Sequence, residues 1–390
     1  MDLSALPVSQ LVALCKERGI RGYSGKKKQD LLGLLSTPVV DVGVDVQDVI
    51  ISCNTRSDLE QSSALSTDMG GEIVRGLVPA RMIDLCAGTG AFSHAFHETG
   101  LVETVYANEM VDASKKIYDL NFTNKLTLKD LHDVNIADIP QHDILTSGFN
   151  CQPFSVAGHQ LGFQDPRSNI FWKILKIIDH HQPKCVILEN VKNLTTHDGG
   201  NTFEIITNNL RDRGYHIRYK ILDTAEITGI SQHRERIYIV CFKSKEAFDQ
   251  FSLDFDPKEK ACVSSAFQTE PVDDKYYYTD KSSTWNLVKD SVVKRNTIYQ
   301  YRRVYVRENK SNECPTLTAN MGGGGHNVPL IRDDKGIRKL TPRECFNFQG
   351  FPSTYVMPQL SDSHLYKLAG NAVSVPVVSL IANRVVPLLM

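Results

Sequence analysis

The chain has 390 residues, a formal net charge of −1 and 41% hydrophobic residues, which is the composition of an ordinary globular protein with room for two or three domains. No apolar run reaches the roughly 18 residues that a membrane span needs, and the N-terminus lacks the pattern of a signal peptide. Nine cysteines without paired CxxC spacing argue against a disulfide framework or a zinc ribbon. We therefore expect an intracellular protein with free thiols, no metal and no membrane span.

Residues 1–37 are predicted to form a small helical unit. Leu6, Val8, Leu11 and Leu14 suit one face of a short helix, the basic turn RGIRGYSGKKK follows, and QDLLGLL restarts a helix. A solvated helical hairpin accounts for this pattern. The stretch LPVSQLVALCKERGIRGYSGKKKQDLLGLL also resembles the SAP-type helix–loop–helix module, and that resemblance implies binding to DNA.

Residues 38–78 have a different composition. Acidic residues, serine and threonine are frequent there, which predicts an acidic linker. The stretch VDVQDVIISC is also compatible with an edge strand.

From residue 81 short apolar runs alternate with helical stretches. The runs are RMIDL, VYANE, DILTSG, CVILEN, HIRYKIL and RIYIVCF, and the clearest helices are AFSHAFHETG and SNIFWKILKIIDHH. This alternation predicts an α/β fold with a doubly wound, mostly parallel sheet. After Phe242 the alternation stops, which indicates a second domain of different build, and NAVSVPVVSLIANRVVPLL near the C-terminus suits a closing helix.

The stretch ILTSGFNCQPFSVAG (residues 144–158) carries a cysteine at the end of a predicted strand. Cys151 lies between Asn150 and Gln152, just after the apolar run ends. Open α/β sheets bind ligands beyond the carboxyl ends of their strands. A cysteine after an apolar run is nevertheless more often an inert buried side chain, so these residues alone do not decide its role.

A second candidate site is DLCAGTGAF, a predicted strand that ends in a Gly-x-Gly turn before a helix. Gly88 and Gly90 allow the backbone to approach a ligand closely. About 20 residues further on, Glu109 ends the next strand, where a carboxylate can accept the hydroxyls of a ribose. Capping of the next helix is an equally good interpretation of Glu109. The absence of a Walker pattern argues against nucleotide hydrolysis.

Charged residues lie at the ends of two further predicted strands. Glu189 ends the strand CVILEN, and a partly desolvated glutamate has a raised pKa and can protonate a ring nitrogen. Arg234 and Arg236 lie two residues apart in SQHRERIYIVCF and so point to one side of a strand. Helix capping and surface salt bridges are the alternative interpretations.

Six motifs occur in one order: DLCAGTGAF, GFNCQPFS, ENVKNL, QHRERIYIV, RKLTPRECFNFQGFP and AGNAVSVP. This set resembles the DNA (cytosine-5)-methyltransferase family, particularly the compact bacterial restriction–modification enzymes, over about residues 81–388. The resemblance implies a Rossmann-like methyltransferase sheet that binds S-adenosyl-L-methionine, with a smaller target-recognition domain. On that basis we expect a catalytic domain over residues 79–250, a target-recognition domain over 251–364 and a C-terminal segment, 365–390, that completes the catalytic domain.

The resemblance also implies roles for single residues. Cys151 matches the cysteine that attacks C6 of a cytosine flipped out of the duplex, and Glu189 matches the residue that protonates N3. Arg236 matches the arginine near the cytosine O2, and Arg234 the more structural one. The matching cofactor positions are Asp84, Leu85, Cys86, Gly88, Gly90, Glu109, Met110, Asp130, Leu131, Asn150, Asn371 and Val373.

The expected partner is double-stranded DNA, bound by a monomer inside the cell. A basic stretch over residues 289–310 favours phosphate contacts once DNA is the substrate, and Thr316 with Leu317 matches the family's recognition pair. The residues expected to contact DNA are Gln152, Ser155, Gly158, Gln160, Arg302, Arg303, Thr316, Leu317 and Gly323.

The sequence departs from the family pattern at two positions. Asn150 stands where the family has proline before the nucleophile, which predicts a less rigid loop. Cys86 stands where a phenylalanine is common, which loosens the adenine side of the cofactor site. Asn150 motivates one alternative to the methyltransferase hypothesis, a catalytically inactive DNA-binding homologue. A tRNA-modifying enzyme of the same fold is the other alternative.

Overall fold

The computed structural model describes residues 78–149, 170–302, 304–322 and 328–390, together with Val8, Gln10, Lys28 and Gln29. By compactness the chain divides into two units, Met1–Gly70 and Gly71–Met390. The predicted helical unit lies outside the described residues except at the four named positions, which are helical, and the predicted linker lies outside them except at Val78. The SAP-like unit, the linker and the domain boundaries therefore stay predictions.

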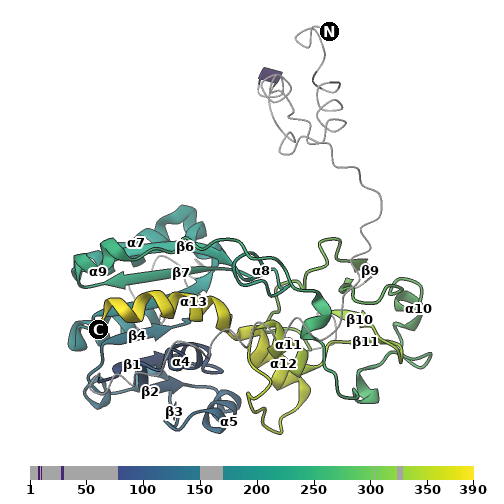
Figure 1. The fold of residues 1–390 in the computed structure, drawn as a ribbon, viewed down its shortest axis with the longest axis horizontal. Helices are drawn as coiled ribbons and strands as arrows, with labels where there is room; N and C mark the ends of the chain where they lie inside the picture. Colours follow the sequence, from purple (N-terminus) through teal and green to yellow (C-terminus); the bar gives the residue numbers. More distant parts are fainter. Residues whose placement is uncertain are drawn as a thin grey trace, which may run out of the picture. The chain divides into compact units, whose positions relative to one another are not determined.

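A seven-stranded sheet forms the centre of the second unit (Figure 1). Its strands lie in the order β3-β2-β1-β4-β5-β7-β6. The first five strands in this order, from β3 through β5, run parallel to one another. Strand β7 runs antiparallel to both of its neighbours, β5 and β6. The strands are β1 (Ala80–Leu85), β2 (Val102–Glu109), β3 (Thr127–Leu128), β4 (Ile144–Ser147), β5 (Cys185–Val191), β6 (His216–Asp223) and β7 (Glu235–Phe242).

Helices cover both faces of this sheet, which confirms the predicted doubly wound fold. Side chains alternate along a strand and so enter two hydrophobic cores, one on each face of the sheet. In β5, Ile187 packs in the first core and Leu188 packs in the second. Helices α4, α5 and α13 pack in the first core, whereas α6 and α7 pack in the second. The helices of this part are α4 (Ala91–His97), α5 (Asp112–Asn121), α6 (Ile170–His181), α7 (Asn201–Asp212), α8 (Thr224–Thr228) and α9 (Lys245–Gln250).

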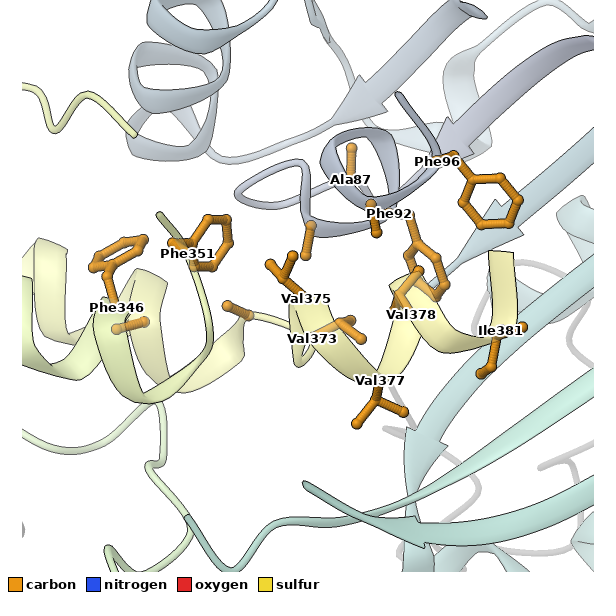
Figure 2. Packing of buried hydrophobic residues seen from close by; sticks show 14 of the residues in the cluster. Ala87, Phe92, Phe96, Phe346, Phe351, Val373, Val375, Val377, Val378 and Ile381 are labelled. Carbon is orange, nitrogen blue, oxygen red and sulfur yellow. The ribbon is translucent and has the colours of Figure 1, made fainter. Parts of the chain in front are cut away.

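The closing helix predicted near the C-terminus is α13 (Val375–Val385). Its apolar side chains, Val375, Val378 and Ile381 among them, lie against Phe92 and Phe96 of α4 (Figure 2). The C-terminal end of the chain thus completes the core of the first sheet. Residues 362–388 are long and apolar enough for a membrane span, but 72% of the 18-residue apolar window within them is buried inside the protein. Ala372–Ser374 also separate α12 from α13.

The segment between α9 and α13 forms a smaller second part. Its four-stranded sheet has the order β11-β10-β8-β9, with antiparallel neighbours, and a small cluster with Val292 and Tyr299 lies beneath it. Its elements are α10 (Trp285–Val288), β8 (Tyr299–Arg302), β9 (Tyr305–Glu308), β10 (Leu330–Arg332), β11 (Ile337–Lys339), α11 (Pro342–Phe348) and α12 (Asp362–Asn371).

Candidate active site

A cavity of about 1030 Å³ lies beyond the carboxyl ends of β1, β2, β4 and β5. The strand order reverses between β1 and β4, and such a switch point is where open α/β sheets bind ligands. Gly88 and Glu109 line the cavity together with Glu189 and Arg236. The predicted nucleoside site and the predicted acid–arginine pair therefore share one space.

The turn after β1 has an unusual backbone. Cys86, Gly88 and Gly90 all have positive φ angles, between 54° and 74°. Successive N–H groups in such a turn point into a concave surface that suits polar or anionic ligand groups. Gly90 itself does not line the cavity; a Cβ there would lie 2.4 Å from the Phe122 ring, so internal packing is what requires this glycine.

Glu109 links the two halves of the predicted cofactor site. Its Oε2 accepts from the Gly88 N–H (3.2 Å), and its Oε1 accepts from the N–H groups of Met110 (2.8 Å) and Val111 (3.2 Å), just before α5. The carboxylate thus has contacts that suit both interpretations of the sequence, helix capping and ribose binding. It accepts from backbone N–H groups at the start of α5, and it also lines the cavity. Its remaining lone pairs can accept ribose hydroxyls.

Other predicted cofactor residues lie around the same end of the cavity. Met110, Asp130 and Leu131 line it, and the Asp130 carboxylate accepts from the His132 N–H at 2.9 Å. Cys86 lines it too, and burial with the nearby Glu109 raises the pKa of its thiol to about 12, so Cys86 stays a neutral thiol.

Asp84 and Leu85 support the site from behind. Both are fully buried and neither lines the cavity. Asp84 Oδ2 accepts from the Ser93 hydroxyl (2.8 Å), and its Oδ1 accepts from the Thr146 hydroxyl (3.0 Å), which ties α4 and β4 to β1. Burial raises the pKa of Asp84 to about 6.

Glu189 and Arg236 form a largely buried pair at the other end of the cavity. Arg236 Nε lies 3.2 Å from Glu189 Oε1, with side-chain exposures of 14% and 10%. Burial raises the pKa of Glu189 above its ordinary value, and Arg236 and Arg234 partly oppose that shift. A carboxyl group with a raised pKa next to a cation can hold or release a proton at a bound heterocycle.

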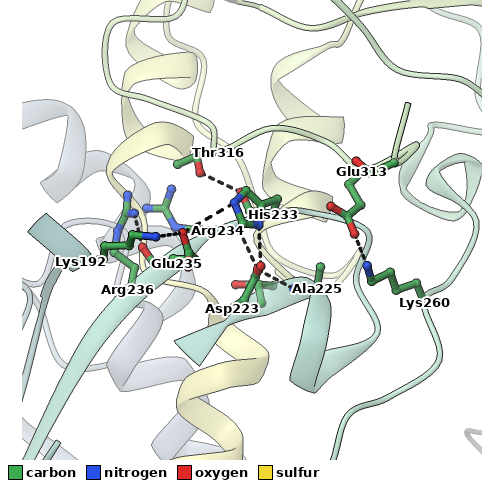
Figure 3. A network of polar contacts seen from close by, with 12 residues as sticks. Lys192, Asp223, Ala225, His233, Arg234, Glu235, Arg236, Lys260, Glu313 and Thr316 are labelled. Carbon is green, nitrogen blue, oxygen red and sulfur yellow. Dashed lines mark hydrogen bonds and ion pairs between the residues drawn. The ribbon is translucent and has the colours of Figure 1, made fainter. Parts of the chain in front are cut away.

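Arg234 has a different environment from Arg236. It is only 2% exposed and donates to the carbonyls of Leu317 (2.9 Å), Gly370 (3.2 Å) and Ala372 (2.7 Å). Figure 3 shows it beside Arg236 and the polar network around His233. These contacts join the sheet to two distant segments of the chain.

The backbone that leads from β4 toward Cys151 is held by the strand next to it. Asn190 Nδ2 donates to the Phe149 carbonyl at 2.8 Å, and Gly148 lies close enough to Glu189 that an added Cβ would be 3.5 Å from its Oε2. Asn150 and Cys151 lie just beyond the described residues. Their predicted roles are untested.

Comparison with known proteins resolves the family. A model of the C-5 cytosine-specific DNA methylase family matches residues 80–386. The chain belongs to that family. It is 46% identical over 308 residues to the type II methyltransferase M.Bsp6I of Bacillus sp. (strain RFL6), which covers 78% of this chain and 98% of the relative. It is also 35% identical over 324 residues to the type II methyltransferase M.HhaI of Haemophilus parahaemolyticus, with 79% and 95% covered.

The fold has a counterpart among solved structures. The Dnmt2 methyltransferase of S. pombe superposes with a TM-score of 0.62 at 21% identity and covers 79% of this chain and 99% of its own. At the N-terminus, a model of the Rho termination factor N-terminal domain matches residues 2–33. The predicted SAP-like unit falls on the same residues and remains a prediction.

Family membership identifies the chemistry of the cavity. The chain is a DNA cytosine-5 methyltransferase that uses S-adenosyl-L-methionine. The cavity fits this cofactor, because it combines the backbone turn at Gly88, the Glu109 carboxylate and an apolar wall that includes Leu131. Asn371, the last residue of α12, and Val373, which follows that helix, line the same cavity.

The residues predicted to contact DNA are only partly described. Gln152, Ser155, Gly158, Gln160, Arg303 and Gly323 lie outside the described residues. Thr316 is half-buried and donates to the His233 carbonyl at 2.7 Å (Figure 3). Leu317 is 1% exposed and packs in the core, so its side chain is not at the surface as expected of a DNA contact. Arg302 is exposed on β8.

Several cavity residues were missed from the sequence. Phe92 stands in the glycine-turn motif, and its position in the first turn of α4 was the signal that could have found it. Asn190 follows Glu189 directly. His364 and Lys367 of α12 also line the cavity, but nothing in the surrounding sequence indicates that. In the described part of the chain, no group of three or more His, Cys, Asp and Glu side chains is placed to hold a metal ion.

Proposed function

We propose that the enzyme methylates cytosine in duplex DNA through a covalent intermediate on Cys151, with the base flipped into the cavity. The observation that carries the proposal is the shared cavity: Glu109, at the nucleoside end, and the Glu189–Arg236 pair face one space. A base stacked inside a duplex cannot present C6 to a thiol, so flipping is required.

In the proposed mechanism the Cys151 thiolate adds to C6 while Glu189 gives a proton to N3, which makes C5 an enamine-like nucleophile. Burial favours the protonated form of Glu189 that this step needs, and Arg236 orients the carboxyl group. When bound, S-adenosyl-L-methionine supplies the methyl group. Loss of the C5 proton to water, departure of the Cys151 thiolate and return of the N3 proton to the Glu189 carboxylate then restore the neutral aromatic ring.

One contact in the described part of the site supports this role for Cys151. The Asn190 amide donates to the carbonyl of Phe149, two residues before Cys151 in the chain, and so holds the backbone at Phe149. We further propose that the enzyme acts as a monomer on DNA inside the cell, with catalytic residues from 79–250 and 365–390 and target recognition from 251–364. The N-terminal unit, residues 1–37, would add sequence-independent DNA affinity.

Covalent trapping tests the mechanism. Duplex DNA with 5-fluorocytosine at the target has no C5 proton to lose, so the native enzyme with cofactor should form a stable adduct and the Cys151→Ser variant should form none. Cys262→Ser is the matched control, because Cys262 is a partly exposed thiol outside the cavity, and its adduct yield should equal that of the native enzyme. If the native enzyme binds this DNA without an adduct, the covalent mechanism is wrong.

Base-resolved sequencing after bisulfite treatment tests the substrate. Unmethylated genomic DNA and tRNA would be incubated separately with enzyme and cofactor. We expect protected cytosines in DNA alone. Methylation confined to tRNA would overturn the assignment of duplex DNA as the substrate.

A further inference from the structure

The β8–β9 hairpin presents two different faces. In its antiparallel register Gln300 lies opposite Arg307 and Arg302 lies opposite Tyr305. Tyr299, Tyr301 and Val306 belong to the other face and pack on the small apolar cluster of the second sheet. Because side chains alternate along a strand, Gln300, Arg302, Tyr305 and Arg307 share the polar face that points away from that cluster.

One amide organises two guanidinium groups on this polar face. Gln300 Oε1 accepts from Arg302 Nη2 at 2.9 Å and from Arg307 Nη2 at 2.8 Å. A guanidinium has five N–H donors, so each arginine keeps enough donors for a two-pronged contact. Gln300 has its acceptor oxygen engaged and so cannot pair with adenine, which needs both an acceptor and a donor.

The charges of these two arginines are not neutralised within the described part of the chain. Two neighbouring cations, by contrast, are neutralised by carboxylates. Lys294 pairs with Glu308 at 2.9 Å, and Arg295 pairs with Asp334. Arg302 and Arg307 form no ion pair with a described carboxylate, although both are exposed. Two oriented, uncompensated guanidinium groups on an exposed ribbon are complementary to an electronegative surface.

The base of the hairpin is connected to the active site. Asn309, just after β9, donates its N–H to the Ile298 carbonyl at 2.9 Å. A few residues later, Cys314 N–H donates to Ser231 (2.7 Å) and its carbonyl accepts from the His233 N–H (2.9 Å). Residues 231–233 lead directly into Arg234 and Arg236, so the ribbon extends from the segment that borders the cavity.

We propose that the hairpin enters the major groove and that Arg302 and Arg307 each bind the edge of a guanine in the target sequence, pre-oriented by Gln300. The inference rests on the proposed duplex DNA substrate. A two-stranded β-ribbon fits the major groove, about 12 Å wide, and a two-pronged arginine contact to O6 and N7 is the commonest specific contact to guanine. Phosphate contacts, by contrast, carry no sequence information.

Arginine-to-lysine variants separate base recognition from phosphate contact. Lysine keeps the positive charge but lacks the planar fork. Full-length Arg302→Lys, Arg307→Lys and Gln300→Ala enzymes would be compared with Arg295→Lys, an exposed arginine of the same segment that is paired with Asp334. Two readouts are taken: the sequences that the protein with bound S-adenosylhomocysteine selects from randomised duplexes, and the sites it methylates in genomic DNA.

Each lysine variant should lose its preference for guanine at one position, by roughly 5- to 100-fold, and keep the native dependence of binding on salt. Gln300→Ala should weaken both positions, and Arg295→Lys neither. Unchanged base preferences, or losses that are uniform over all sequences, would overturn the inference. If the native protein selects guanine-containing duplexes but methylates none, the proposed function fails and the inference stands.

Discussion

Replacing Arg234 and Arg236 separately by methionine should damage the enzyme in two different ways. Arg234 donates to three carbonyls from two distant segments and is 2% exposed, so its loss leaves buried acceptors without donors. Burial and the neighbouring Arg236 lower the pKa of Arg234 to about 9, so it is still charged at neutral pH.

The expected loss of stability follows from those contacts. A hydrogen bond from a charged donor contributes about 1.5–3 kcal/mol to stability. The net loss should be smaller than the sum of three such bonds, because removing a buried guanidinium also removes its desolvation cost. We expect Arg234→Met to lower the free energy of unfolding by about 3 kcal/mol, which corresponds to a Tm that is roughly 5–10 °C lower.

Arg236→Met should spare stability and reduce activity. Its Nε lies 3.2 Å from Glu189 Oε1 in the cavity, so its loss removes the cation that orients the proton donor. We expect a decrease in kcat of roughly 100-fold with a Tm within about 3 °C of the native value. Thermal unfolding and single-turnover methylation of both variants measure the two effects. Equal Tm losses, or an Arg234→Met enzyme of native stability, would refute the division of roles.

Three further changes have defined outcomes. Gly148 lines the cavity, and Gly148→Ala adds a methyl group there in ordinary contact with Glu189 Oε2 (3.5 Å). Because this methyl group takes space beside the acid without a clash, we expect native Tm but kcat/KM for DNA at least about 10-fold lower; an unchanged kcat/KM would contradict this. Asp84 has a pKa raised to about 6 by burial, so the folded state binds the extra proton between pH 3.8 and 6 and its stability falls as pH rises through that window, by up to about 3 kcal/mol. The Asp84→Asn variant should lack this loss of stability. Its Tm relative to the native enzyme should therefore rise between pH 4.5 and 7.5. A Tm difference that stays constant over this range would argue against the prediction. Deleting residues 1–37 should weaken DNA binding but leave the methylated sequence unchanged, and a changed sequence would exclude a sequence-independent role.

The large sheet was predictable because most of its strands are short and buried on both faces. Strands β1, β4 and β5 appear in the sequence as apolar runs of the right length, and the helical repeat of α6 is equally clear. The two-residue strand β3 has no such pattern and was missed. The local sequence therefore predicts buried strands well, but it does not predict a strand of two residues that is defined only by pairing with its neighbour.

The contacts of single site residues were harder to predict from the sequence, because they depend on partners far away in the chain. The carbonyls that accept from Arg234 lie 83, 136 and 138 residues further on. The same holds for Leu317, which was expected to contact DNA and instead packs in the core while its backbone N–H donates to Gln232. The motif gives the type of residue, but the distant packing decides which way it points.

The Glu189–Arg236 pair depends on the direction of one strand. Glu189 lies near the carboxyl end of β5, whereas Arg236 is the second residue of β7 and Arg234 directly precedes that strand. In a fully parallel sheet the end of one strand and the start of the other would lie at opposite edges. Because β7 runs antiparallel, Arg236 lies opposite Val191 and diagonal to Glu189. The single reversed strand thus brings arginines from a strand's beginning to the edge where the parallel strands end, and the acid, its cation and the cofactor turn meet there.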